Sequence, residues 1–112
     1  IVTDTPHILA EFSMSPLDKG TSLSPYVAKI LDIIDRSELD YELHAMGTLL
    51  EGPWNEVMTV IRQCHDLLAR DAGRISTTIK IDYRRNAADR ITGKVDSVEQ
   101  KLGRQLQSKR SS

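Results

Sequence analysis

The order in which the hydrophobic pattern changes its period constrains the fold of this chain more than any other feature. The segment Ile75–Tyr83 (ISTTIKIDY) alternates between two faces at every residue, which is typical of a half-buried β-strand. His7–Met14 and Tyr41–Met46 alternate in the same way, and Thr48–Glu51 follows as a fourth short strand. Gly47 separates the last two strands, so they meet there in a hairpin or at a bulge.

Apolar residues at helical spacing lie between these strands. Ser24 can cap a helix whose first position is Pro25, because a missing N–H costs nothing there, and this helix ends near Ser37. A second helix opens at Pro53 and stops before Gly73. The apolar faces comprise Val27, Ile30, Leu31 and Ile34 in the first helix, Val57, Ile61, Cys64 and Leu68 in the second, and Ile91, Val95, Val98, Leu102 and Leu106 in a C-terminal amphipathic helix.

The predicted order is strand, helix, strand, strand, helix, strand, followed by one more helix. It matches the ferredoxin-like βαββαβ sandwich, an α+β fold with an antiparallel four-stranded sheet. We expect one such domain over residues 7–106, with an extension at 1–6 and a polar tail at 107–112. The sheet face away from the helices can meet water or form a wet subunit interface that traps a ligand. The alternation places Glu11, Ser13, Glu42, His44, Met46, Thr78, Lys80 and Asp82 on that face, with either Thr48 or Glu51 depending on register.

Charge and hydropathy exclude several classes of partner. The 112 residues carry a net charge of −1, which provides no positive field for nucleic acid or anionic lipid. We find no uninterrupted apolar run of signal-peptide or membrane-span length, so we expect no membrane partner. A single cysteine, Cys64, excludes an internal disulfide and suits a reducing compartment, the cytoplasm or else the nucleus. His7, His44 and His65 show no metal-ligand spacing, so we predict no metal site.

Five segments match the pattern of one known family in its order and spacing. The most specific is DYELHAMGTLLEGPWNEVM (Asp40–Met58), which contains MGT-x-x-EG. The other four are AEFSMSP (Ala10–Pro16), SLSPYV (Ser22–Val27), IKIDYR (Ile79–Arg84) and KVDSV (Lys94–Val98). In these segments the chain resembles the thiamine-binding, MTH1187-like family. The resemblance implies a ferredoxin-like fold, association into dimers and tetramers, and, as in several relatives, binding of thiamine or its pyrimidine moiety; it implies no established reaction.

Glu51 is the residue to which the resemblance gives most weight. From the residues alone, a carboxylate at a strand end just before a helix is a capping or dipole-satisfying acid. With the resemblance, Glu51 is the expected ligand contact, because an aminopyrimidine nitrogen or a thiazolium cation favours an acid nearby.

Four further residues are expected around the same ligand. Ser13 and Thr48 can hydrogen-bond an exocyclic amine or hydroxyl, or be ordinary strand hydroxyls. Glu11 adds acidity or pairs with Lys80, and exposed pairs of that kind contribute little to stability. Trp54, in the first turn of the second helix, packs in the core or an interface, or else stacks on a cationic ring.

These observations predict a non-enzymatic protein that binds thiamine or a related pyrimidine as a homodimer or homotetramer and requires no cofactor. The alternative is an oligomeric regulatory module whose ligand is a phosphate- or sulfate-type anion. It is motivated by the uncovered sheet face and the apolar C-terminal stripe. The anion is suggested by Asp18–Ser22, a loop that leads into a helix and could present backbone N–H groups. A small hydrolase is the third interpretation, because this fold also hosts enzymes, although no Ser-His-Asp order, phosphate loop or paired-carboxylate motif is present.

Overall fold

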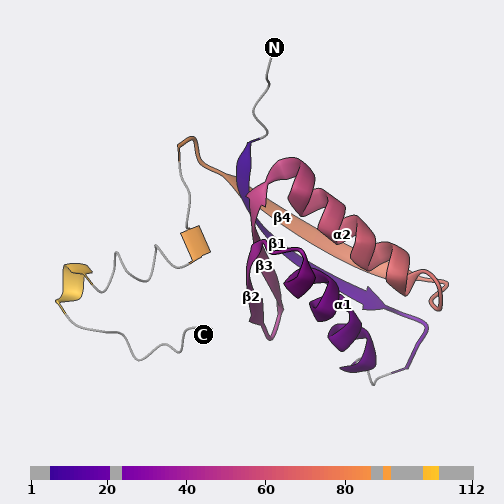
Figure 1. Ribbon diagram of the computed structural model, residues 1–112. Helices are drawn as coiled ribbons and strands as arrows, with labels where there is room; N and C mark the ends of the chain where they lie inside the picture. Colours follow the sequence, from indigo (N-terminus) through magenta and orange to yellow (C-terminus); the bar gives the residue numbers. More distant parts are fainter. Residues whose placement is uncertain (1–5, 21–23, 87–89, 92–99, 104–112) are drawn as a thin grey trace, which may run out of the picture.

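The computed structural model, which describes residues 6–20, 24–86, 90–91 and 100–103, has the predicted ferredoxin-like architecture. Two helices cover one face of a four-stranded antiparallel sheet whose strand order is β2-β3-β1-β4 (Figure 1). The elements are β1 (His7–Pro16), α1 (Ser24–Arg36), β2 (Asp40–His44), β3 (Gly47–Pro53), α2 (Trp54–Leu68) and β4 (Ile75–Tyr83).

The first strand is longer than its alternation predicts. The alternation predicts a strand that ends at Met14, but β1 continues to Pro16. The reason is β4, which is long enough to pair with these residues, with Ser15 opposite Ser76 and Pro16 opposite Ile75. Pro16 is the last residue of the strand, and one further backbone hydrogen bond, from the Leu17 N–H to the Arg74 carbonyl at 2.9 Å, continues beyond it.

β2 and β3 form a hairpin, which settles the choice between a hairpin and a bulge around Gly47. His44 pairs with Gly47, so Ala45 and Met46 alone make the turn. The register also settles which face each residue of β3 occupies. Thr48 lies opposite Phe12, on the face toward the helices, whereas Glu51 lies opposite Leu9, on the other face, which we call the open face.

The core lies between the sheet and the two helices. The predicted stripe of α2 is buried in full, with Val60 in addition. In α1 only Ile30 and Ile34 are buried, while Val27 is 45% exposed. The buried core cluster comprises Ile8, Ala10, Phe12, Ile30, Ile34, Leu50, Val57, Val60, Ile61, Cys64 and Leu68.

β4 has the predicted bounds, but it has no fully buried face. Seven of its nine residues are exposed, and the apolar Ile79 and Tyr83 are among them. α2 packs on β1 and β3, and β4 is the strand beyond them at the edge of the sheet. The alternation of apolar residues therefore identified β4 as a strand, while the position of β4 at the edge of the sheet decided how little of it is buried.

The predicted C-terminal helix is described only in part. Residues 90–91 and 100–102 are helical, and Ile91 is half-buried. Val95, Val98 and Leu106 lie outside the described residues, as do residues 1–5 and 107–112. Among the described residues, no helix combines the length and apolar character needed to span a membrane.

Candidate functional site

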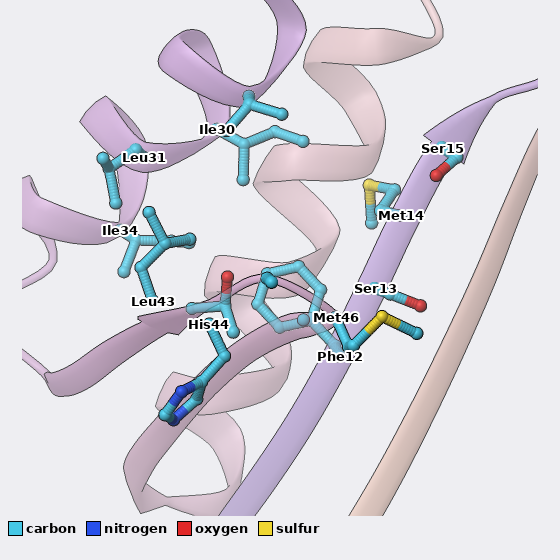
Figure 2. A pocket seen from close by; sticks show the side chains of 14 residues that line it. Phe12, Ser13, Met14, Ser15, Ile30, Leu31, Ile34, Leu43, His44 and Met46 are labelled. Atoms are coloured by element: carbon cyan, nitrogen blue, oxygen red, sulfur yellow. The ribbon is translucent and has the colours of Figure 1, made fainter. Parts of the chain in front are cut away.

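A pocket of about 420 Å³ opens between α1, the second half of β1 and the β2–β3 hairpin (Figure 2). Its walls are mainly apolar. α1 forms one wall of the pocket, and β1 forms the opposite wall. The turn of the β2–β3 hairpin closes one end. The lining residues are Phe12, Ser13, Met14, Ser15, Val27, Ile30, Leu31, Ile34, Leu43, His44, Ala45, Met46, Gly47 and Thr48.

The apolar wall from α1 is the stripe that the sequence predicted as core. Ile30, Leu31 and Ile34 lie across the gap from Phe12 and Met14 (Figure 2). Ile30 and Ile34 are buried at the base of the pocket, whereas Leu31 is only half-buried. Ile30 and Ile34 therefore belong both to the core and to the pocket lining, whereas Val27 and Leu31 line the pocket with partly exposed side chains.

The hairpin supplies the exposed rim of the pocket. Met46 is 87% exposed and Leu43 is 46% exposed. Together with Val27 of α1 they leave apolar side chains in water around the opening. Such a cluster is typical of a binding site, since isolated exposed apolar residues are common but grouped ones are not.

Thr48 is the polar side chain best placed to face a ligand. It lies on the helix-facing side of β3 opposite Phe12 and is 7% exposed. Ser13 borders the pocket, but its side chain points away from Ile30 and Ile34 (Figure 2), in agreement with its place on the open face beside Glu11. The lining contains no Asp, Glu, Lys or Arg among the described residues.

His44 also borders the pocket without facing into it. Its ring points away from Ile34 and Phe12 (Figure 2). Nε2 lies 3.5 Å from Oε1 of Glu42. The imidazole is therefore directed toward a neighbouring carboxylate rather than toward the space under α1.

The glycine of the MGT segment is explained by close packing behind the pocket. A Cβ atom on Gly47 would lie 3.0 Å from the backbone oxygen of Phe12. That contact is with backbone, which cannot rotate away. Gly47 therefore lets the hairpin approach β1 and close the end of the pocket.

Glu51 is held in a different cluster, which we call the carboxylate clasp: His7, Glu51, Asp82, Arg90 and Ile91. The carboxylate is 1% exposed. Its Oε2 accepts from His7 Nε2 at 3.0 Å and from the Arg90 backbone N–H at 2.8 Å, and Oε1 accepts from the Ile91 N–H at 3.1 Å. Burial by itself raises the pKa of Glu51, but the hydrogen bonds from Arg90, His7 and Ile91 outweigh it and hold that pKa below its ordinary value.

The side chain of Arg90 completes the clasp. Its NH2 group donates to Asp82 Oδ2 at 2.6 Å and its NH1 group donates to the Asp82 carbonyl at 3.1 Å. The hydrogen bond from Arg90 also lowers the pKa of Asp82. The clasp thus ties β1, β3 and β4 to residues 90–91.

The structure separates the predicted ligand residues rather than gathering them. Thr48 and Ser13 border the pocket. Glu51 lies three residues along β3 from Thr48, about 10 Å for an extended strand, and on the opposite face. Its carboxylate already has three donors, so the geometry does not favour it as a ligand contact.

Glu11 and Trp54 also lie away from the pocket. Glu11 is opposite Lys80 on the open face, in a shallow groove of about 170 Å³ that Leu9, Leu49 and Asp82 also line. Trp54 is 39% exposed in the first turn of α2, where its backbone N–H donates to the Pro6 carbonyl at 2.7 Å. Their roles as ligand contacts remain predictions.

Sequence reasoning missed the apolar lining because helical spacing alone cannot tell a core side chain from a pocket side chain. Val27 and Leu31 fit the core stripe equally well. A weak signal was present at Met46, an apolar residue in a hairpin turn, where polar residues are usual.

Cys64 is a buried apolar side chain rather than a reactive one. It lies on the buried face of α2 within the core cluster, and burial raises the pKa of its thiol to about 11. In the part of the chain that the structure describes, no three His, Cys, Asp or Glu side chains are grouped to hold a metal ion.

Comparison with known proteins agrees with the fold and the motif. The family described as thiamine-binding protein matches residues 10–99. A UPF0045 protein of Methanothermobacter thermautotrophicus is 39% identical over 98 residues, which cover 85% of this chain and 99% of that protein. A UPF0045 protein of Methanocaldococcus jannaschii is 34% identical over 91 residues, covering 81% of this chain and 91% of the relative.

Solved structures show the same fold. The crystal structure of a hypothetical protein from Methanocaldococcus jannaschii superposes with a TM-score of 0.76 at 33% identity, covering 83% of this chain and 96% of that one. A Thermotoga maritima protein, described as a candidate thiamine biosynthesis/salvage protein, superposes with a TM-score of 0.72 at 22% identity, covering 83% and 99% of the two chains. From its sequence and its fold, the chain belongs to the thiamine-binding protein family.

Proposed function

We propose that the pocket under α1 binds thiamine or a related pyrimidine, and that the protein holds this ligand without transforming it. One observation carries the proposal: an apolar pocket with a threonine at its base lies beside the MGT segment of a thiamine-binding family member. Its volume of about 420 Å³ falls within the range of about 300–1,000 Å³ usual for small-molecule sites.

The chemistry of the lining suits an uncharged aromatic ring. An aminopyrimidine can pack between the Phe12 ring on β1 and the aliphatic side chains of α1, while the Thr48 hydroxyl hydrogen-bonds a ring nitrogen or the exocyclic amine. The lining residues that the structure describes offer no carboxylate to a thiazolium cation. We therefore place the pyrimidine inside and the thiazolium at the exposed rim near Met46, where water solvates its charge.

A binding role does not call for a catalytic base in the pocket. Among the described lining residues the one histidine, His44, points away from the pocket (Figure 2). We further propose that the protein acts as a homodimer or homotetramer and needs no cofactor.

The anion-binding alternative has less support from the described residues. Asp18, at the start of the loop proposed for it, accepts a hydrogen bond from the Gly73 N–H at 2.8 Å. A carboxylate in that position repels an anion.

Isothermal titration with thiamine, its hydroxymethylpyrimidine and sulfate tests the proposal. We expect saturable binding of thiamine and of the pyrimidine near micromolar, about −8 kcal/mol, and none of sulfate. Binding of sulfate without thiamine would replace this proposal with the anion-binding module.

A matched pair of variants on α1 locates the site. Val27→Trp fills the opening from an exposed position, so it should weaken binding about tenfold or more, since it competes for the space of the ring. Ala28→Trp puts the same side chain on the exposed neighbouring position outside the lining and should leave affinity unchanged. Equal affinity in both variants would place the ligand elsewhere.

A further inference from the structure

The two helices rest on the sheet in different ways. α2 packs on β1 and β3, whereas α1 packs chiefly on α2 and contacts the strands much less. The pocket of about 420 Å³ separates α1 from β1 and from the β2–β3 hairpin (Figure 2). α1 therefore has room to move toward β1.

Burial along α1 decreases from its C-terminal end to its N-terminal end. Ile34 is 0% exposed, Ile30, about one turn earlier, is 9% exposed, and Val27, nearly one turn earlier again, is 45% exposed. All three side chains lie on one face of the helix and line the pocket. The last turns of α1 are therefore seated in the core, while its first turns are not.

Hydrogen bonds fasten the C-terminal end of α1. The Tyr41 hydroxyl on β2 donates to Asp35 Oδ1 at 2.9 Å. The Ser37 hydroxyl oxygen accepts from the Leu39 N–H at 3.2 Å, just beyond the helix. Between them the chain turns at Glu38, whose φ of 63° is in the left-handed region common at helix C-termini. This end of α1 is thus tied to the start of β2.

The first half of the helix, Ser24–Ile30, has no such fastening. Among the residues that the structure describes, no hydrogen bond or ion pair joins this half to a strand. Its one specific side-chain contact of another kind, Lys29 Nζ at 6.0 Å from the centre of the Tyr26 ring, stays within the helix. α1 therefore has one fixed end and one end that only apolar packing holds in place.

We propose that α1 is a lid on the ligand site, whose first half tilts toward β1 about the fixed end at Ser37–Glu38 when a ring occupies the pocket. The inference rests on the proposed function, because the lid closes on that ring. Val27 and Leu31 are partly exposed in the open pocket. In the closed form they pack on the ring and lose water, and this burial of apolar surface favours closure.

Closure also explains how a shallowly exposed site can hold its ligand. With α1 tilted inward, the ring lies between the helix and Phe12 on β1, so the ligand leaves only after the helix has opened again. A rigid α1 would instead leave Val27 half in water at the opening while the ligand is bound.

Distances between paired spin labels test the tilt. Labels on Ala28→Cys and Thr78→Cys join the first half of α1 to β4, and both positions are exposed and outside the pocket lining. Cys64 is buried and should stay unlabelled. The labelled chain is diluted with excess unlabelled protein, so that the distances within one chain are measured. We expect saturating thiamine to shift the distances of this pair to shorter values.

Arg36→Cys, paired with the same Thr78→Cys, is the matched control. Arg36 lies on the same helix and is exposed, but it is next to the fixed end. Its ion pair with Asp32 is exposed, so its loss should cost little. Thiamine should leave the distances of this pair unchanged. An equal shift in both pairs would overturn the tilt, because the whole helix would then have moved.

Calorimetric titration of the same labelled proteins separates this inference from the function on which it rests. Absence of thiamine binding overturns the proposed function and the lid together. Saturable binding with unchanged distances in the Ala28–Thr78 pair overturns the lid alone and leaves a rigid pocket. Saturable binding with shorter distances in that pair, and unchanged distances in the control, supports both.

Discussion

At the scale of single residues, the MGT-x-x-EG segment is understood position by position. Gly47 allows the hairpin to approach the Phe12 carbonyl, and Thr48 places a hydroxyl at the base of the pocket. Glu51 anchors the carboxylate clasp. Gly52 makes room for Leu39, whose Cδ2 would lie 2.8 Å from a Cβ there. The segment therefore combines three residues that line the pocket, Met46, Gly47 and Thr48, with two that fasten or shape the surrounding fold, Glu51 and Gly52.

Gly47→Ala should weaken both ligand binding and the fold. The added methyl group meets the backbone of β1 at 3.0 Å, so the hairpin must move away and widen the closed end of the pocket. We expect a loss of about 1–3 kcal/mol in unfolding free energy and a rise of about tenfold in the thiamine dissociation constant. Urea unfolding and calorimetric titration measure the two effects, and an unchanged affinity would show that the hairpin does not contact the ligand.

At the scale of elements, α1 shows how one apolar stripe divides between folding and binding. Ile34 is fully buried against the sheet, whereas Val27 lies at the pocket opening with 45% of its surface exposed. Both residues occupy the same helical face and obey the same spacing. The difference in exposure accompanies the pocket that opens between α1, β1 and the β2–β3 hairpin, which helical periodicity does not report.

Truncating the two residues should separate these roles. Ile34→Ala leaves a cavity in the core and should lower the unfolding free energy by about 2–5 kcal/mol. Val27→Ala removes a partly solvated side chain and should change it by no more than about 0.5 kcal/mol while weakening thiamine binding. Chemical denaturation checks the stabilities. A large loss from Val27→Ala would mean that α1 packs more deeply than the structure shows.

At the scale of the whole molecule, the carboxylate clasp joins segments that are far apart in sequence. His7, Glu51, Asp82 and residues 90–91 meet at one end of the sheet, while the pocket lies toward the β2–β3 turn. The clasp and the pocket are thus separate sites, and a change at the clasp should act on stability rather than on affinity.

Acid should weaken the fold through Glu51. The folded-state pKa of this carboxyl is below its ordinary value, so it contributes stability above the unfolded pKa of about 4.5, and this contribution is lost as pH falls through the folded pKa. Glu51→Gln keeps the shape but removes the charge, so it should cost about 1–3 kcal/mol at pH 7 and flatten the decline of stability in acid.

Urea unfolding from pH 7 to pH 3 measures both effects. Glu11→Gln, an exposed glutamate on the same sheet, is the control and should follow the unmodified profile. Thiamine affinity of Glu51→Gln at pH 7 should remain that of the unmodified protein. A marked loss of affinity would restore Glu51 as a ligand contact.

The sequence alone determined the element order, the ferredoxin-like fold and the bounds of β4, because the period of apolar residues is a local property that each segment carries by itself. The motif likewise identified the family. Tertiary structure decided what the motif residues do. Thr48 and Glu51 were alternatives for one face until pairing with β1 assigned them to opposite faces, since a shift of one residue in register exchanges the faces of a strand. The partners of Glu51 come from positions 7, 90 and 91, and the pocket joins α1 to a hairpin turn, so both depend on contacts between distant segments that no local pattern encodes.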